Sequence, residues 1–278
     1  MPNKIWQFQR LEEIETATEN KVWLINKISG ETALFKTDYN CMKIPENQAE
    51  VNVYQIALQL GISSAITESI NINDIDWEGF DVIAAGFEYP TGTISYNFKT
   101  DKNVIYKTAD RAFGKIGGVS GKVTFESRNN SSLSDMDYKT LLQKFPDIKE
   151  DIINMAYLDC LVNNSDRHGE NWELICDPKT SKILKIAPLF DHAIALQNGY
   201  SDNLSRIYWE LPPKKYQDKL QSHFEVFQNF CKHHFESIKV LLNKTEESAE
   251  NNKLDGFTIS RFKEMKEIYQ LQKGCLLL

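Results

Sequence analysis

The stretch YLDCLVNNSDRHGENW, residues 157–172, decides the fold and the chemistry that we expect of this chain. Its apolar first part continues a helix predicted over residues 148–162, and its last residue begins a strand. Asp166 and Asn171 lie five residues apart in the polar loop between the helix and the strand. Asp191 follows twenty residues later, at the end of another apolar segment. These three polar groups are therefore expected to meet at one site.

Two aspartates and an asparagine in this order are typical of phosphoryl transfer. One aspartate accepts the proton of the substrate hydroxyl, while the asparagine and the second aspartate hold Mg²⁺ against the nucleotide phosphates. We expect Asp166 to be the catalytic base and Asn171 and Asp191 to bind the metal. Taken singly, each residue has a plain structural explanation, as a helix-ending turn, an ordinary turn and a cap. These explanations do not account for the spacing of the three residues together.

A lysine and a glutamate that fit the same chemistry precede this region. Lys36 ends a β-prone run shortly after Ser29 and Gly30, and Glu50 follows fourteen residues later in a predicted helix. In a phosphotransferase a strand lysine contacts the nucleotide phosphates, and a helix glutamate orients that lysine. We expect Lys36 and Glu50 to form this ion pair, with Ser29 and Gly30 in the loop over the phosphates. The alternative is that both charges are simply solvated.

The hydrophobic periodicity predicts an α+β fold with two lobes. The N-lobe, residues 1–100, is expected to be small and β-rich, and the C-lobe, residues 101–278, larger and helical, with the boundary near residues 99–110. Short β-prone runs between Gly and Pro residues predict strands over 21–26, 31–36, 80–87, 93–98, 104–106, 172–176 and 183–186. Apolar spacing predicts helices over 47–60, 134–145, 148–162 and most of 213–271.

The motif at residues 157–172, with Ala187–Asp191 after it, resembles the catalytic and metal-binding signature of bacterial HipA-like serine/threonine kinases. It is especially similar to the compact CtkA type. Residues 34–36 and 49–62 resemble the nucleotide lysine and the glutamate helix of the same family. The resemblance implies a bilobal protein-kinase-like fold, ATP with Mg²⁺, and transfer of phosphate to a serine or threonine hydroxyl.

The resemblance also implies a role for each residue of the site. These roles are phosphate contact for Lys36, orientation of that lysine for Glu50, proton acceptance for Asp166, and metal binding for Asn171 and Asp191. Arg167 and His168 are implied to shape the loop, with His168 beside the cofactor. Ser29, next to Gly30, is the candidate for autophosphorylation.

Two departures from the family pattern leave other functions open. His192-Ala193 follows Asp191 where relatives have a small pair such as Asn-Gly, and Gly30 is the one glycine of the expected phosphate loop. One alternative is a nucleotide-binding pseudokinase that acts as a toxin or effector interaction protein. Another is a phosphoinositide kinase, since the Asp-Arg-His loop is also similar to type II phosphatidylinositol 4-kinases.

Composition limits the partners that we expect. The 278 residues include 32 Lys and Arg against 39 Asp and Glu, a formal net charge of −7, and no window is strongly basic. This argues against nucleic acid as a partner. A protein substrate with a serine or threonine acceptor is expected, and an antitoxin-like inhibitor is a further candidate partner.

Cysteine usage and hydropathy indicate the compartment. The five cysteines are scattered without metal-ligand spacing, which favours reduced thiols in a cytoplasmic protein, with delivery into a host cell as the alternative. The N-terminus lacks the apolar segment of a secretory signal, and no apolar run is long enough for a membrane span.

Two further short motifs carry less weight. Cys275-Leu276-Leu277-Leu278 has the form of a prenylation signal, so membrane contact is expected only if Cys275 is prenylated; an apolar chain end is the alternative. The Gly-rich segment 114–122 does not fit a Walker phosphate loop, because Ile116 stands where a glycine is needed and Val123 follows Lys122. A lobe-connecting or substrate-side loop is expected there.

Overall fold

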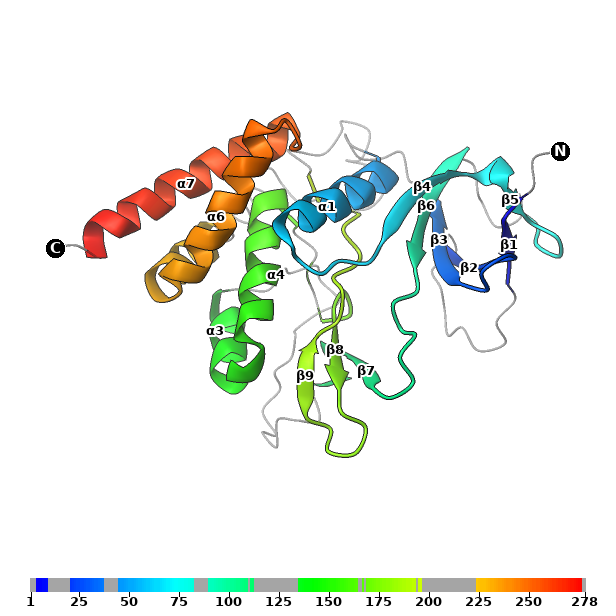
Figure 1. The fold of residues 1–278 in the computed structure, drawn as a ribbon, viewed down its shortest axis with the longest axis horizontal. Helices are drawn as coiled ribbons and strands as arrows, with labels where there is room; N and C mark the ends of the chain where they lie inside the picture. The colour runs from blue at the N-terminus through cyan, green and yellow to red at the C-terminus, as the bar shows by residue number, and fades with distance from the viewer. Residues whose placement is uncertain are drawn as a thin grey trace, which may run out of the picture.

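The structure of the chain is a computed structural model that describes residues 4–9, 21–37, 45–82, 90–109, 111–112, 135–164, 167, 169–193, 195–196 and 224–276. Within these residues, helix α1 (Glu46–Leu60) lies between two groups of elements (Figure 1). The β-sheet of the N-terminal part of the chain is on one side, and the remaining helices are on the other. This confirms the predicted α+β arrangement, with a β-rich N-terminal part and a helical C-terminal part.

The larger sheet has six strands in the order β4-β6-β3-β2-β1-β5. The strands are Trp6–Phe8 (β1), Lys21–Asn26 (β2), Thr32–Thr37 (β3), Thr67–Asn71 (β4), Ile75–Asp76 (β5) and Thr91–Tyr96 (β6), and a short 3₁₀ helix, Ile72–Asp74, precedes β5. Strands β1 and β5 pair in parallel, and the other neighbours pair antiparallel. The predicted hairpin of β2 and β3 is present, with Gly30 in its turn at a φ of 75°. Strand β3 is therefore paired on both sides.

The two faces of this sheet differ in character. One face buries Leu24, Phe35 and Ile94 in a core that also includes Trp6 and Ile75. Successive side chains of a strand point to opposite faces. The other face therefore carries the cross-strand pairs Lys21–Lys36 and Trp23–Leu34, whose register the β2–β3 ladder fixes.

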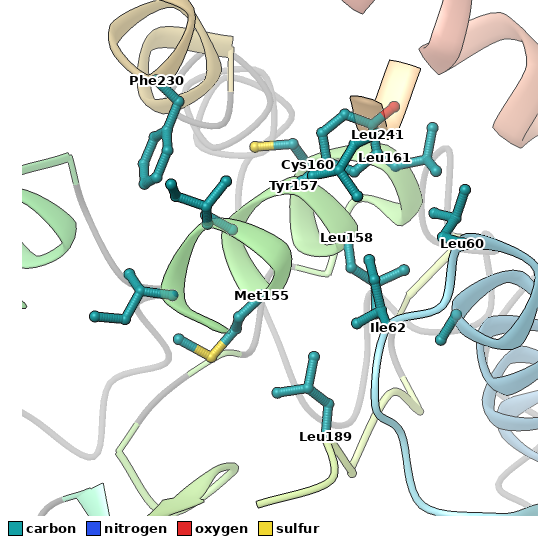
Figure 2. Packing of buried hydrophobic residues seen from close by; sticks show 14 of the residues in the cluster. Leu60, Ile62, Met155, Tyr157, Leu158, Cys160, Leu161, Leu189, Phe230 and Leu241 are labelled. Carbon is teal, nitrogen blue, oxygen red and sulfur yellow. The ribbon is translucent and has the colours of Figure 1, made fainter. Parts of the chain in front are cut away.

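The helical part is built around α4, Lys149–Val162. Every residue from 155 to 162 is buried, which is typical of a helix that occupies the centre of a domain. Figure 2 shows its side chains radiating toward different neighbours, among them Leu60 of α1, Leu189 and Phe230. The other helices are Asp135–Lys144 (α3), Pro146–Ile148 (3₁₀), Phe235–Glu250 (α6) and Gly256–Leu276 (α7), and residues 224–233 are also helical.

Helix α1 shares its core with these helices rather than with the sheet. Its buried residues Val53, Ile56 and Leu60 belong to the same hydrophobic cluster as α4. Gly61 ends α1 in the left-handed conformation, at a φ of 69°, and Lys244 of α6 donates a hydrogen bond to the Leu60 carbonyl (2.8 Å). The helix is thus fixed to the helical part of the molecule.

A second, three-stranded sheet supports the segments that follow α4. Its order is β7-β8-β9, and its strands are Ile105–Thr108 (β7), Glu173–Cys176 (β8) and Ile183–Ile186 (β9). The expected lobe boundary, at residues 100–101, lies between β6 and β7. Strand β8 follows the polar loop of the sequence motif, and β9 leads toward Asp191.

Three strands, β1, β4 and β5, are not predicted by the sequence, and one predicted strand differs. Strands β4 and β5 have the sequences TESIN and ID, which lack apolar alternation, so pairing with β6 and β1 rather than local pattern makes them strands. The strand predicted over 80–87 is not formed at residues 80–82. Residues 83–89 lie outside the described residues.

Other predictions fall partly inside the described chain. Cys160, Cys176 and Cys231 are buried free thiols, as predicted. In the described residues no helix combines the length and the apolar character needed to cross a bilayer. Cys41, the segment 114–122 and the last two residues of the chain lie outside the described residues.

Gly92 offers a test of how tightly the sheet is built around β3. A Cβ atom at this position would overlap the Lys36 carbonyl oxygen and lie 2.7 Å from the Phe35 ring. Gly92→Ala should therefore destabilise the protein by about 2 kcal/mol, as overpacking of a core does. Urea unfolding measures this change.

Gly256→Ala is the matched control, because in the described part of the chain the added Cβ meets no atom within 4 Å outside its own helix, and Gly256 starts helix α7. Its free energy of unfolding should stay unchanged or rise slightly. Equal stability of the two variants would contradict the packing described for Gly92.

Candidate functional site

Three segments that are distant in sequence meet at the ammonium group of Lys36. Lys36 lies near the end of β3, and its Nζ donates hydrogen bonds to Oε1 of Glu50 and to Oδ1 of Asp191, both at 2.8 Å. Glu50 comes from α1, and Asp191 from the segment that follows β9. The structure thus brings together one cation and two carboxylates that the sequence identifies as site residues.

The ionisation of this triad follows from its mutual attraction. Burial alone would lower the pKa of Lys36, but the charges of Asp191 and Glu50 outweigh burial and raise that pKa above its ordinary value. Burial alone would raise the pKa of Asp191, yet Lys36 and Lys21 lower that pKa below its ordinary value. Lys36 is therefore cationic and Asp191 anionic at neutral pH.

Glu50 is positioned by the rigid setting of α1. Its side chain is 3% exposed, and the apolar residues on the same side of the helix are packed in the core. The chain after α1 then runs beside the chain before Asp191. Backbone hydrogen bonds join Ala65 to the Leu189 carbonyl (2.8 Å) and Leu189 to the Ser63 carbonyl (3.0 Å). The segment that carries Asp191 is thereby tied to the helix that carries Glu50.

Asp191 itself has an unusual backbone. Its φ of 59° lies in the left-handed region, which few residues other than glycine adopt. Its side chain is 24% exposed, so the carboxylate is reached by solvent although Lys36 covers one oxygen. A partly exposed, ionised carboxylate on a backbone in the left-handed region is a common feature of functional sites.

The loop of the sequence motif is anchored on α4. Asn163 ends the helix in the left-handed conformation, at a φ of 53°, and Asn164 donates to the Asp159 carboxylate through its Nδ2 (3.1 Å). Asn171 is buried where the loop reaches β8. Asp166, the predicted base, and His168 lie outside the described residues.

Arg167 lies within this loop and is fully buried. Its guanidinium forms an ion pair with Asp159 (3.0 Å) and donates hydrogen bonds to the carbonyls of Asn171 and Phe190. It also contacts Nδ1 of His192 (3.1 Å). The sequence alone does not indicate these contacts, because Asp159 reads as one polar residue within an apolar helix.

The structure does not bring Ser29 and Gly30 to this site. Lys21 pairs with Lys36 at one end of the β2–β3 ladder, and the turn that contains Ser29 and Gly30 closes the other end. Lys36 is the sixth residue after Gly30, and six steps along an extended strand correspond to about 20 Å. The turn with Ser29 and Gly30 therefore lies at the end of the hairpin that is distant from Lys36. Ser29 is exposed and donates a hydrogen bond from its hydroxyl to Glu31 (2.8 Å).

Lys21 is a site residue that the sequence pattern does not single out. It stands directly opposite Lys36 in the ladder, so both side chains project from the same face of the sheet. Within the described residues the Lys21 side chain makes no hydrogen bond or ion pair, and its charge acts on Asp191. Two like charges directly opposite each other destabilise a sheet unless anions lie beside them. Lys21 could be identified as a neighbour of Lys36 only from the register of β2 and β3, which cannot be read from the sequence pattern.

His192, one of the departures from the family pattern, is buried beside this network. Burial and the charge of Arg167 lower its pKa well below the ordinary value, so the imidazole is neutral. Within the described chain its Nε2 has no hydrogen-bond partner. His192 therefore fills space behind Asp191 as a neutral ring.

The oxygen donors of this site suit a hard divalent cation. Mg²⁺ is usually bound by one or two protein oxygens together with substrate phosphates. Asp191 supplies an ionised, partly exposed carboxylate, and Asn171, whose side chain has an amide oxygen, is joined to the carbonyl before Asp191 through the Arg167 guanidinium. In the described residues no three His, Cys, Asp or Glu side chains form a cluster that could hold a metal by themselves. The residues therefore fit a cation that takes some of its ligands from the protein and the others from phosphate.

Comparisons with known proteins give similarity at the level of solved structures. The sequence matches no protein-family model and no curated protein. The chain is similar to the Helicobacter pylori proinflammatory kinase CtkA, with 16% identity, a TM-score of 0.49, and 95% of this chain and 94% of that chain aligned. It is also similar to the Golgi casein kinase with Mn and ADP bound, with 13% identity, a TM-score of 0.45 and coverages of 97% and 71%. A third similar structure is HipA of the Shewanella oneidensis MR-1 toxin–antitoxin system, with HipB and operator DNA, at 13% identity, a TM-score of 0.39 and coverages of 98% and 72%.

Replacing Lys36 by methionine should destabilise the protein by about 3 kcal/mol, because the change leaves the Glu50 carboxylate buried without its cation. Adding Glu50→Gln to the same chain should restore part of this loss. Urea unfolding, followed by circular dichroism, measures both changes.

Lys27→Met is the control for this prediction. Lys27 pairs with Asp76 at 3.1 Å on the same sheet, but these side chains are 39% and 30% exposed, against 14% and 3% for Lys36 and Glu50. Its removal should leave the free energy of unfolding almost unchanged. Similar losses for Lys36→Met and Lys27→Met would contradict a buried triad that stabilises the fold.

Proposed function

We propose that this protein is an ATP- and Mg²⁺-dependent kinase that transfers phosphate to serine or threonine hydroxyls of a protein. The observation that carries the proposal is the Lys36 ammonium held at 2.8 Å from both Glu50 and Asp191. A lysine fixed in this way presents a positive charge at a defined place. Catalysis of phosphoryl transfer depends mainly on such positioning and on neutralisation of phosphate charge.

The residues of the triad have separate tasks in this proposal. Glu50 holds the Lys36 side chain, so that its ammonium needs no reorganisation when phosphate oxygens bind. Asp191 and Asn171 would hold Mg²⁺, which supplies charge neutralisation at the phosphates when bound. Lys21, opposite Lys36, adds a second positive charge on the same face of the sheet. The polyphosphate chain of ATP fits this concentration of cations.

Asp166 is proposed as the base that accepts the proton of the acceptor hydroxyl. The residues on either side of positions 165–166 are both held by one buried carboxylate. Asn164 and Arg167 each donate to Asp159, at 3.1 Å and 3.0 Å. The residues that flank the proposed base are thus positioned by a shared partner, which is what a precisely placed functional group requires.

The half-buried apolar pair Trp23–Leu34 supports a place for the nucleotide base. This pair lies two residues along the strands from the Lys21–Lys36 pair and on the same face of the sheet. An apolar surface next to a cationic one matches the two halves of a nucleotide. We propose that the adenine lies against this pair, with the phosphates toward Lys36.

The decisive test is phosphate transfer from labelled ATP with Mg²⁺, with the modified residues mapped by mass spectrometry. Label should appear on serine or threonine of the protein itself or of an added protein substrate. Asp166→Asn and Asp191→Asn should each reduce transfer by about 100-fold or more, because the base or a metal ligand is lost. Asp147→Asn, which alters an exposed carboxylate of the helical part, should leave transfer unchanged.

The other outcomes separate the alternatives. Transfer to phosphoinositides in vesicles, with none to protein, would identify a lipid kinase. Binding of ATP without transfer to either acceptor would identify a pseudokinase. Transfer that persists in both Asp166→Asn and Asp191→Asn would contradict the proposed roles of these residues.

A further inference from the structure

Arg167 is the most deeply buried charged side chain near the site, and the triad does not use it. The guanidinium is inaccessible to solvent, and Asp159 of α4 neutralises it through Nη2 (3.0 Å) and Nε (3.0 Å). Tyr138 of α3 donates to the same carboxylate at 3.4 Å. A buried ion pair of this kind seldom increases stability over an apolar pair of similar size. The buried Arg167–Asp159 pair is better explained by the specific positions that it imposes on neighbouring groups.

The free end of the guanidinium joins the two loops that carry the proposed metal ligands. Nη1 donates to the Asn171 carbonyl (2.5 Å) and to the Phe190 carbonyl (2.9 Å). Phe190 directly precedes Asp191, and His192, which contacts Nη2 at 3.1 Å, directly follows it. One side chain therefore holds the backbone of Asn171 and both neighbours of Asp191.

This set of contacts requires an arginine. The planar guanidinium has five N–H donors in a fixed geometry, whereas the lysine ammonium is a compact charge with three. Here the Nε edge faces Asp159 and the Nη1 end faces the two carbonyls. A lysine at position 167 could keep a charge near Asp159 but could not span both loops.

We propose that Arg167, anchored by Asp159, is a positioning residue that sets the separation of Asn171 and Asp191 and thereby builds the divalent-cation site. The inference rests on the proposed function and extends it to two buried residues. Arg167 touches neither phosphate nor metal in this account. Its effect passes through the backbone of the two ligands, as outer-shell hydrogen bonds act on metal sites.

The chain contains a matched control in Arg261. Arg261 is also buried, at 4% exposure, and also donates to α4, to the Cys160 carbonyl at 2.7 Å. Its guanidinium stacks on Phe224 at 4.1 Å, within the helical core. Arg261→Lys therefore perturbs a buried arginine of the same kind away from the two loops.

The experiment measures Mn²⁺ binding by electron paramagnetic resonance in the presence of ADP, and ADP binding without metal by calorimetry. Arg167→Lys should weaken Mn²⁺ binding by about 10- to 100-fold and leave metal-free ADP binding unchanged. Arg261→Lys should leave both affinities unchanged. Asp159→Asn, which keeps the size of the side chain, should weaken Mn²⁺ binding in the same direction, and circular dichroism verifies that each variant is folded.

The outcomes distinguish this inference from the proposed function. Mn²⁺ affinity that survives both Arg167→Lys and Asp159→Asn in folded proteins would overturn the positioning role and leave the kinase proposal standing. Equal loss of metal-free and metal-dependent binding in Arg167→Lys would also overturn it, since that pattern indicates general structural damage. A wild-type protein that binds neither ADP nor Mn²⁺ with ADP would overturn the proposed function, and the inference with it.

Discussion

The ion pairs of Lys36 with Glu50 and Asp191 hold together three parts of the chain that would otherwise carry unpaired charges. Strand β3 supplies the cation, α1 supplies one carboxylate, and the segment after β9 supplies the other. Glu50 is 2% exposed, and a carboxylate at such a place needs a cation or hydrogen-bond donor beside it. Both contacts of Lys36 form only if three features place their atoms at hydrogen-bond distance. These features are the register of β3, the position of α1 and the path of the chain to Asp191.

The position of α1 makes this agreement possible. Its apolar side packs with α4, Lys244 holds its last carbonyl, and the chain beyond it pairs with Leu189, two residues before Asp191. The helix also contacts β4 and β6 of the sheet, so it joins the two parts of the molecule. A conformational change that separates Glu50 from Lys36 would disturb the packing of α1.

Sequence reasoning succeeds where chemistry is local and fails where register or distant packing decides. The Lys36–Glu50 pair is predictable, because a lysine at the end of a strand can reach a glutamate in the helix that follows it in the chain. The place of Gly30 is not predictable in this way, because the register of the ladder, not proximity in sequence, decides which end of the hairpin lies at Lys36. Asp159 is missed for a related reason. Its partner Arg167 is reached only after α4 ends in a left-handed turn that redirects the chain.

The most direct test of a phosphate site at Lys36 uses an acyl-phosphate derivative of ATP, which transfers its acyl group to a lysine amine near the bound phosphates and releases ATP. Labelled peptides identified by mass spectrometry should contain Lys36 or its neighbour Lys21, and excess Mg-ATP should suppress this labelling. Lys27, at the far end of the same strands, should react equally with and without Mg-ATP. Labelling of Lys36 and Lys21 that Mg-ATP does not suppress, or suppression confined to other lysines, would contradict the account.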